Sequence, residues 1–181
     1  MARTAGVERA LAHAAKVRMM IFDVDGILTD GSLQFGSDGE QLKRFNVLDG
    51  YGIRMLQDQG IVTAIISART SAIVSRRAAD LGIGHVQQGA HDKRTAFEKL
   101  LQTTSMTPME CGFAGDDWLD LPILLQAGFS ASVPNAHHEV RSRVHYVTEA
   151  GGGRGAVREL CDLILRAQGK YDSALAVYIH E

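Results

Sequence analysis

The chain of 181 residues is poor in the residue types that mark special classes of protein: it has two cysteines, three prolines and one tryptophan. Cys111 and Cys161 stand alone, without the spacing of a metal site or a disulfide framework, so we expect two buried thiols in a reducing cytoplasm. No low-complexity tract or proline-rich linker divides the sequence. We therefore predict one domain over residues 1–181, with the segment after about Lys170 as a tail that could be extended.

Excess charge and long apolar runs are also missing. Lys and Arg number 19 against 21 for Asp and Glu, and this net charge of -2 offers no general attraction to nucleic acid or to an anionic membrane. No stretch approaches the roughly 18 apolar residues of a membrane span. Near the N-terminus Glu8, Arg9 and Lys16 interrupt any signal-peptide core. We expect a cytoplasmic protein whose partner is a small molecule, with no nucleic acid and no membrane.

What the sequence does contain is a regular alternation of short apolar runs with helical segments. We predict strands at residues 18–23, 61–66, 84–87, 110–114, 129–133 and 145–147, and helices at 7–17, 49–59, 71–81, 92–102, up to 127 and after Pro134. This alternation is typical of an α/β fold, here a Rossmann-like, mostly parallel sheet with helices on both faces. Two further segments, 32–35 and 41–47, flank a Gly- and Asp-rich connection and predict a β-hairpin over the crevice beside the first strand.

The first predicted strand ends abruptly in two carboxylates, Asp23 and Asp25, followed by Gly26. In parallel sheets ligands bind beyond the carboxyl ends of the strands, so both acids are aimed at a crevice. Ionised acids at the edge of an apolar core repel each other and are costly unless a cation is bound. The pattern predicts a hard divalent cation such as Mg²⁺, which takes oxygen ligands.

Other strands and turns bring polar side chains to the same edge of the sheet. Ser67 follows the next predicted strand, Lys93 opens a helix, and Asp116 and Asp117 follow a later strand. Carboxylates from two strands suit Mg²⁺, while a hydroxyl and an ammonium group suit the non-bridging oxygens of a phosphoryl group. Because phosphoryl transfer needs little beyond such positioning and charge neutralisation, the set indicates phosphate chemistry.

In order along the chain, these residues match the four motifs of the haloacid dehalogenase superfamily of phosphotransferases. The motifs are an apolar strand with Asp-x-Asp-Gly, a Ser or Thr ending the next strand, a Lys opening a helix, and Gly-Asp-Asp-x-x-Asp. Here they are residues 21–26, Ser67, Lys93 and 115–120. One motif alone is weak evidence, but four in order are strong. The chain thus resembles this superfamily, which implies the haloacid dehalogenase fold.

The resemblance implies a role for each of the matched residues. Asp23 is expected to attack phosphorus and become an aspartyl phosphate, and Asp25 to protonate the leaving oxygen and later deprotonate water. Ser67 and Lys93 are expected to hold the phosphoryl oxygens, with Lys93 also orienting Asp23. Mg²⁺ is expected to be bound by the Asp23 carboxylate, the Asp25 backbone carbonyl and Asp116. Asp117 and Asp120 are expected to support this site from outside the ligand set.

Further residues narrow the resemblance to members that have no cap domain and act on a sugar acid phosphate in lipopolysaccharide biosynthesis. These residues are Gly31, Gly36, Gly39, Glu40, Lys43, 45–47, 49–54 and 151–159. The implied substrate is 3-deoxy-D-manno-octulosonate 8-phosphate, and the implied assembly is a homotetramer in which neighbours cover each active site. Arg69, Lys43 and Arg154 are candidates for binding the sugar carboxylate. The chain departs from the pattern at Ser67-Ala68-Arg69, where Thr-Gly-Arg is usual; serine keeps the hydroxyl.

Several alternatives to this interpretation were weighed. A calcium-binding loop is disfavoured because Gly26 is at loop position four rather than six, and Gln34 stands where a bidentate Glu is needed. A signalling receiver domain also groups acids around Mg²⁺, but it lacks Asp-x-Asp on its first strand. A non-catalytic regulatory domain and a phosphatase for another sugar acid phosphate are the other candidates, and the intact motif set argues against the former.

Overall fold

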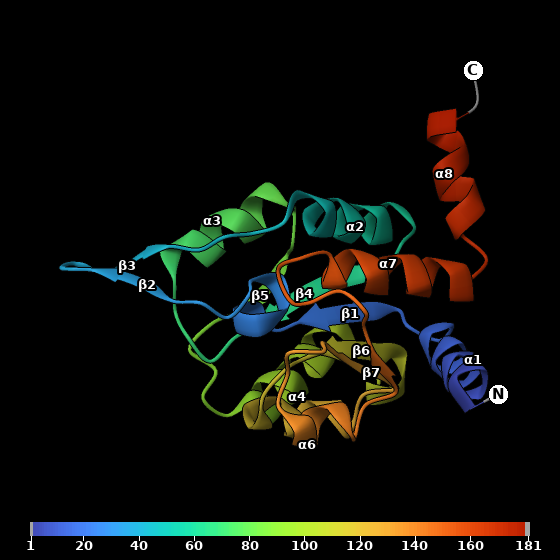
Figure 1. The fold of residues 1–181 in the computed structure, drawn as a ribbon, viewed down its shortest axis with the longest axis horizontal. Coiled ribbons are helices and arrows are strands. Elements are labelled where there is room, and N and C mark those ends of the chain that lie inside the picture. Colours follow the sequence, from blue (N-terminus) through green and yellow to red (C-terminus); the bar gives the residue numbers. More distant parts are fainter. Residues whose placement is uncertain (1, 180–181) are drawn as a thin grey trace.

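The computed structural model describes residues 2–179 and has a parallel sheet of six strands at its centre (Figure 1). The strand order is β5-β4-β1-β6-β7-β8, and each neighbouring pair is parallel. The strands are β1 (Met19–Phe22), β4 (Val62–Ile66), β5 (His85–Gln87), β6 (Cys111–Ala114), β7 (Phe129–Ser132) and β8 (Tyr146–Val147). All six predicted strands are therefore confirmed, with ends that differ by at most one residue.

Helices cover both faces of this sheet, as predicted. One apolar layer joins the sheet to α1 (Ala2–Ala14), α2 (Val47–Asp58), α3 (Ala72–Asp80) and α7 (Ala156–Ala167). The other layer joins it to α4 (Lys93–Thr104), α5 (Leu121–Leu124) and α6 (His138–Arg141). Figure 1 shows α2, α3 and α7 on one side of β1 and α4 and α6 on the other.

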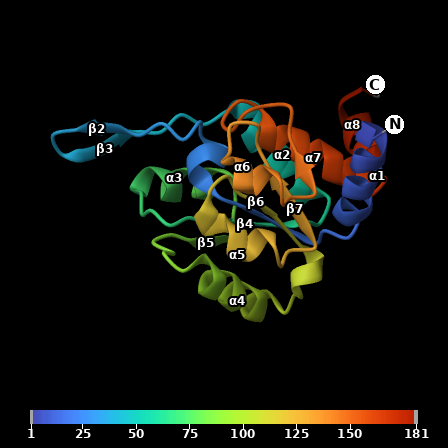
Figure 2. The ribbon, with the colours of Figure 1, turned by 60° about the horizontal axis from the view of Figure 1, so that its bottom comes forward.

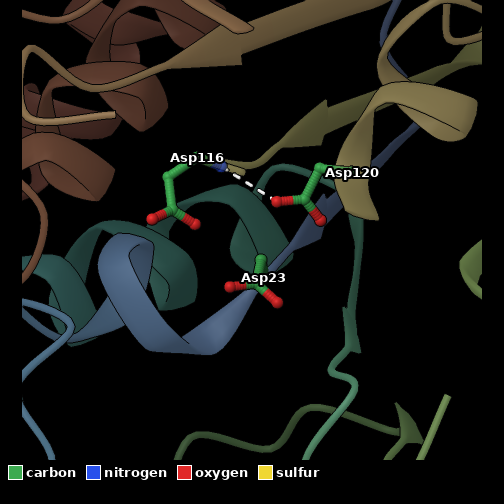
Figure 3. Close-up of side chains that lie close together, drawn as sticks. All are labelled: Asp23, Asp116 and Asp120. Atoms are coloured by element: carbon green, nitrogen blue, oxygen red, sulfur yellow. Dashed lines mark hydrogen bonds between the residues drawn. The ribbon is translucent and has the colours of Figure 1, made fainter. Parts of the chain in front are cut away.

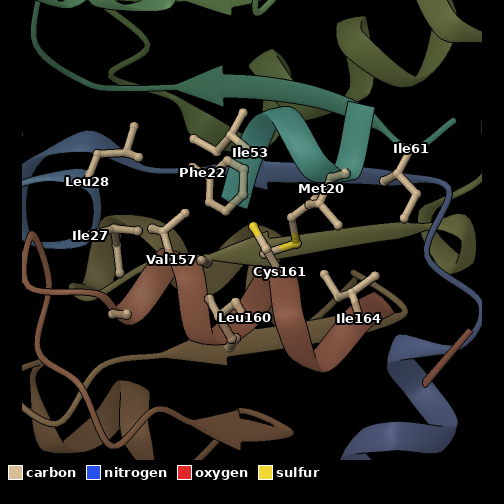
Figure 4. Packing of buried hydrophobic residues seen from close by; sticks show 14 of the residues in the cluster. Met20, Phe22, Ile27, Leu28, Ile53, Ile61, Val157, Leu160, Cys161 and Ile164 are labelled. Carbon is tan, nitrogen blue, oxygen red and sulfur yellow. The ribbon is translucent and has the colours of Figure 1, made fainter. Parts of the chain in front are cut away.

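The central strand β1 is buried on both sides, and its four apolar residues divide between the two layers. Met20 and Phe22 pack with Ile53 of α2 and Leu160 of α7 (Figure 4). Met19 and Ile21 belong to the opposite layer, and all four side chains of the strand have no exposed surface. Burying one such side chain contributes about 1.5–3 kcal/mol. This packing fixes the end of β1, and with it the position of the acid that follows.

The predicted hairpin is present, but it projects away from the body of the molecule instead of lying over the crevice (Figures 1 and 2). Strands β2 (Gln34–Gly36) and β3 (Gly39–Leu42) are antiparallel, and Gly36 pairs with Gly39 across a tight turn. The second strand is shorter than predicted, because the chain after Leu42 leaves the ladder and Lys43 turns into the molecule, where it is buried. Phe35 is 61% exposed on the hairpin.

Helix α2 begins at Val47, two residues before the predicted start, because the Asn46 side chain accepts a hydrogen bond of 2.8 Å from the Leu48 amide. Two glycines lie inside the helix, where they permit close packing. A Cβ on Gly50 would overlap the guanidinium of Arg77, and a Cβ on Gly52 would lie 3.1 Å from Arg158 Cδ of α7. The glycines therefore serve helix packing rather than a turn.

The C-terminal part of the chain corrects two expectations. The segment after Lys170 is not extended: it forms the helix α8 (Tyr171–Ile179), after Gly169 ends α7 with a φ of 66°. Here Arg166 stacks on the Tyr171 ring, 3.5 Å from its centroid. The helix predicted up to residue 127 is shorter, because residues Trp118–Asp120 form a 3₁₀ turn and α5 ends at Leu124.

Two smaller findings concern cysteines and membranes. Cys111 and Cys161 are both buried and free, as expected. Within residues 2–179, none of the helices has the length and apolar character that crossing a bilayer requires.

Candidate active site

The site begins where β1 ends and the chain turns sharply through η1 (Val24–Leu28), a segment in which Asp25 and Gly26 have non-helical backbone angles. Gly26 sits in this turn with a φ of 101°, a conformation that L side chains rarely adopt. A Cβ at this position would also overlap the Asp116 carboxylate. The glycine therefore has two reasons to be there: it allows the sharp turn after the two acids, and it gives Asp116 room to approach them.

Beside this turn lies an open pocket of about 210 Å³ at the carboxyl edge of the sheet. It brings together eight of the residues that sequence analysis singled out, from four separate segments of the chain. They are Asp23, Asp25, Ser67, Arg69, Lys93, Asp116, Asp117 and Asp120, and the pocket is completed by Ala68 and Leu119. The predicted convergence of these side chains at one sheet edge is therefore confirmed.

Lys93 is the cation at the centre of the pocket and is only 4% exposed. It is the first residue of α4, whose start is fixed by Asp92 accepting hydrogen bonds from the amides of Arg94 and Thr95. Its ammonium group donates to Asp23 Oδ1 at 2.6 Å and to Asp120 Oδ1 at 2.5 Å. Burial by itself lowers the pKa of Lys93, but the two carboxylates outweigh burial and raise it, so the group stays protonated.

Asp120 uses both of its carboxylate oxygens to hold neighbouring groups. While Oδ1 accepts from Lys93, Oδ2 accepts from the backbone amides of Asp116 at 2.9 Å and Asp117 at 3.2 Å (Figure 3). The Asp117 side chain in turn accepts from the amide of Trp118 at 2.8 Å. The loop after β6 is thus folded around its own acids, and this folding presents Asp116 to the pocket.

The acids of this pocket form a group that fits a divalent metal ion. Asp23, Asp116 and Asp120 each place one carboxylate oxygen within 4.8 Å of the others (Figure 3). Burial, with repulsion from Asp120, raises the pKa of Asp23 to about 7, although Lys93 acts against it. Burial, with repulsion from Asp23 and Asp120, raises the pKa of Asp116 to about 8. Clustered acids whose ionisation is this costly need a further cation, and hard oxygen ligands suit Mg²⁺.

Asp25 faces a different set of partners, supplied by the base of the hairpin and the loop after β4. Lys43 donates a hydrogen bond to Asp25 Oδ1 and forms an ion pair with Glu40, with 2.9 Å between Nζ and Oε1. Arg69 Nε lies 3.6 Å from Asp25 Oδ2. Sequence analysis gave Glu40 no role of its own; its only local signal was its position three residues before Lys43.

Arg154 is exposed and lies outside the catalytic pocket. It belongs to the glycine-rich loop at 151–155 and borders a neighbouring pocket with Asp30 and Asn135. This loop packs directly on η1, because a Cβ on Gly152 would overlap the carbonyl oxygen of Gly26.

Asp49 of α2 holds the far end of that loop, a role that sequence analysis did not assign. Its carboxylate accepts from the amides of Gly155 at 3.3 Å and Arg158 at 2.8 Å, and so caps the start of α7 from another helix. The only signal in the sequence was an acid in the first turn of the helix, on the face that also carries the buried Ile53 and Leu56.

Comparison with known proteins agrees with this geometry. A family model described as haloacid dehalogenase-like hydrolase matches residues 83–157. The 3-deoxy-D-manno-octulosonate 8-phosphate phosphatase of Yersinia pestis is 46% identical over 169 residues, which cover 93% of this chain and 90% of that protein. Its counterpart in Escherichia coli K12 is 47% identical over 164 residues, covering 91% and 87%.

Among solved structures, the corresponding phosphatase from Moraxella catarrhalis, in complex with magnesium ion, phosphate ion and a KDO molecule, superposes with a TM-score of 0.91. It is 43% identical, and the match covers 93% of this chain and 97% of that one. The fold and the site thus define a haloacid dehalogenase-like hydrolase. Within that class the relatives agree on one activity. The chain belongs to the family of 3-deoxy-D-manno-octulosonate 8-phosphate phosphatases.

Proposed function

We propose that the chain is a Mg²⁺-dependent phosphatase that hydrolyses 3-deoxy-D-manno-octulosonate 8-phosphate to the free sugar acid and phosphate. The observation that carries the proposal is the cluster of Asp23, Asp116 and Asp120 around Lys93, in a chain that shares 46% identity with such a phosphatase over 93% of its length. The sugar is a component of lipopolysaccharide, so we assign the enzyme to lipopolysaccharide biosynthesis. The cytoplasmic location expected from the sequence stays a prediction.

In the proposed mechanism Asp23 is the nucleophile. One of its oxygens is held by Lys93 at 2.6 Å, which orients the carboxylate and leaves the other oxygen to attack phosphorus. Attack forms the bond from Asp23 to phosphorus and breaks the bond from phosphorus to the sugar oxygen, and Asp25 gives that oxygen a proton. Water then attacks the aspartyl phosphate while Asp25 takes a proton from it, which restores both acids.

Neutralising charge is the main task of the remaining residues. The Asp23 and Asp116 carboxylates and the backbone carbonyl of Asp25 would hold Mg²⁺. When bound, the ion neutralises the phosphate and lets an anionic carboxylate approach it. Ser67 and Lys93 bind phosphoryl oxygens from the opposite side. Asp120 is fully engaged by Lys93 and two backbone amides, which favours a role in positioning rather than in binding the metal.

The sugar carboxylate needs a basic partner, and the three candidates differ in their availability. The Arg69 side chain is 43% exposed, and its contacts with Asp25 and Glu40 are long, at 3.6 and 3.7 Å. The Lys43 side chain is 1% exposed and holds two carboxylates, so it is not free to bind a third. Arg154 is exposed but lies beside the neighbouring pocket. We therefore assign the sugar carboxylate to Arg69.

We further propose that the enzyme is a homotetramer in which neighbours complete the site. Supporting this, the catalytic pocket is open, and the hairpin beside it carries exposed apolar side chains: Leu33, Phe35 and Leu42. A hairpin of two strands is marginally stable on its own and gains from packing against another surface. Light scattering coupled to size-exclusion chromatography should give the mass of four chains, and an active monomer would contradict this arrangement.

Phosphate release from a panel of substrates tests the activity itself. We expect kcat/KM to be highest for 3-deoxy-D-manno-octulosonate 8-phosphate and to fall for sugar phosphates without a carboxylate. Arg69→Met should reduce this preference by about 10- to 100-fold, the effect of losing one charged contact. Activity that is equal across the panel would refute the substrate assignment while leaving phosphatase chemistry intact.

A further inference from the structure

Two acids and two cations at the base of the hairpin contact one another in a closed network, in which each cation lies next to both acids. The proposed mechanism assigns no role to the contacts within this network. Lys43 contacts both Asp25 and Glu40, and Arg69 approaches the same two acids from the open side of the pocket. Asp25 and Glu40 carry like charges, so they can be neighbours only because these cations lie between them.

Lys43 is the inner cation of this network. Its side chain is 1% exposed, whereas that of Arg69 is 43% exposed. Burial alone lowers the pKa of Lys43, but its hydrogen bonds to Asp25 and Glu40 outweigh burial and raise it. Lys43 is therefore a permanent, shielded cation, while Arg69 is the cation that incoming molecules can reach.

Glu40 anchors Lys43 to the rigid part of the fold. Its Oε2 accepts a hydrogen bond of 2.5 Å from Ser71 Oγ, at the start of α3. The Ser71 amide is itself held by Gln88 Oε1 at 2.8 Å. The resulting chain of contacts runs from the loop after β5, through Ser71 and Glu40, to Lys43 and finally to Asp25. A short buried chain of this kind restrains the last group in it.

We propose that Lys43, anchored by Glu40, is a positioning residue that holds the Asp25 carboxyl in the orientation needed for proton transfer to and from the reacting oxygens. The inference rests on the proposed role of Asp25 as the general acid and base. Because Lys43 bonds to Oδ1, and Arg69 approaches Oδ2 only at 3.6 Å, Oδ2 is the oxygen without a close partner that can face the sugar or water oxygen. The hairpin base thereby belongs to the catalytic apparatus as well as to the cover of the site.

The test compares two substrates that both lack a carboxylate, so that loss of a contact to the sugar acid plays no part. D-arabinose 5-phosphate has an alkoxide leaving group that needs a proton, whereas the leaving group of 4-nitrophenyl phosphate needs none. Lys43→Met should lower kcat/KM about 10- to 100-fold for the sugar phosphate and about threefold or less for the nitrophenyl ester, a part of the full effect of general acid catalysis.

The same comparison in Asp25→Asn, and in the double variant, separates the possible outcomes. Asp25→Asn should show the same dependence on the leaving group, and adding Lys43→Met should reduce activity no further, because both changes remove one function. If Asp25→Asn shows no such dependence, the proposed role of Asp25 fails, and the role of Lys43 fails with it. The positioning role of Lys43 alone is refuted if Asp25→Asn shows the dependence on the leaving group and Lys43→Met does not. It is also refuted if the activity losses of the two single variants multiply in the double variant.

Two further variants guard against a general loss of structure. Glu40→Gln keeps the cation and removes its anchor, so it should reproduce the selective loss at smaller size, and it decides the question if Lys43→Met does not fold. Lys170→Met is the control, because Lys170 is a half-buried lysine away from the pocket that donates to Gln59 O at the C-terminal end of α2, at 2.9 Å. It should leave both activities unchanged. An equal loss on both substrates in Glu40→Gln would overturn the proposal.

Discussion

Two acids of the pocket, the buried Asp23 and the half-buried Asp116, should make the stability of the metal-free protein fall as the pH rises. In an unfolded chain each carboxyl titrates near 3.8, but in the folded protein burial and mutual repulsion raise the pKa to about 7 for Asp23 and about 8 for Asp116. The two carboxyls therefore bind protons more tightly in the folded state than in the unfolded state. Proton binding stabilises the folded state in full below pH 3.8, where both states are protonated. That stabilisation is lost as the pH rises through the folded pKa values.

The magnitude follows from the size of these shifts. A tenfold change in proton affinity is about 1.4 kcal/mol, so the rise from 3.8 to about 7 at Asp23 corresponds to about 4 kcal/mol. The two acids raise each other's pKa, so their effects do not add in full, and we expect about 4–6 kcal/mol between pH 4 and 8. Asp116→Asn should remove the larger part of this loss, since it takes away one acid and the repulsion that it exerts.

Urea unfolding in the presence of a chelator, at a series of pH values from 5 to 8, measures the effect. Burial lowers the pKa of His145, so this residue reduces the stability of the fold as the pH falls, opposite to the effect of the acids. Because His145 is present in both proteins, the quantity to compare is the difference in free energy of unfolding between wild type and variant. Without metal, Asp116→Asn should become the more stable protein at pH 8. With Mg²⁺ the order should reverse, because the ion binds the ionised acids of the wild type. If the free energies of unfolding of the two proteins in chelator depended on pH in the same way, the Asp116 carboxyl would not be a source of the loss of stability.

Two other substitutions test the geometry of the site. Asp23→Asn keeps the shape of the side chain but removes the nucleophile, so turnover should fall at least about 1,000-fold while binding of Mg²⁺ weakens; near-normal turnover in a phosphate-release assay would exclude Asp23 as nucleophile. Gly152→Ala places a methyl group against the backbone of Gly26 and should destabilise the protein by about 3 kcal/mol or more in urea unfolding. Gly169→Ala is the control: the position has open space around it, so the substitution should lower the free energy of unfolding only by the strain of a positive φ.

The sequence predicts the sheet and the catalytic pocket well because both depend on strong local signals. A run such as residues 19–22, apolar on both faces and followed by polar residues, is typical of a central parallel strand, and parallel strands bring their carboxyl ends together. Asp23, Ser67, Lys93 and Asp116 could therefore be placed in one crevice from their positions in the chain. Their individual chemical roles came from the resemblance to a family.

The features that escaped prediction depend on contacts between distant segments. Asp49 caps α7, more than a hundred positions away, and Glu40 meets Ser71 of another element. The start of α2 was placed two residues late because the predicted helix left out the Asn46 cap, and the close packing of Arg77 and Arg158 against its glycines was not foreseen. Helix α8 was missed because its side chains are largely exposed, which gives a weak pattern of burial. Tertiary packing outweighs local preference at each of these places.

In the proposed mechanism phosphoryl transfer passes through Asp23, and this step can be tested by trapping the aspartyl phosphate. Asp25→Asn treated with Mg²⁺ and 4-nitrophenyl phosphate should release a burst of nitrophenol and accumulate the aspartyl phosphate, because its breakdown lacks the base. Reduction with borohydride converts an aspartyl phosphate to homoserine, which peptide mass spectrometry locates in the chain. If Asp23 is the nucleophile, we expect homoserine at position 23 in the presence of Mg²⁺ and no homoserine without it. A burst with an unmodified residue 23, or with homoserine at another acid, would contradict this assignment.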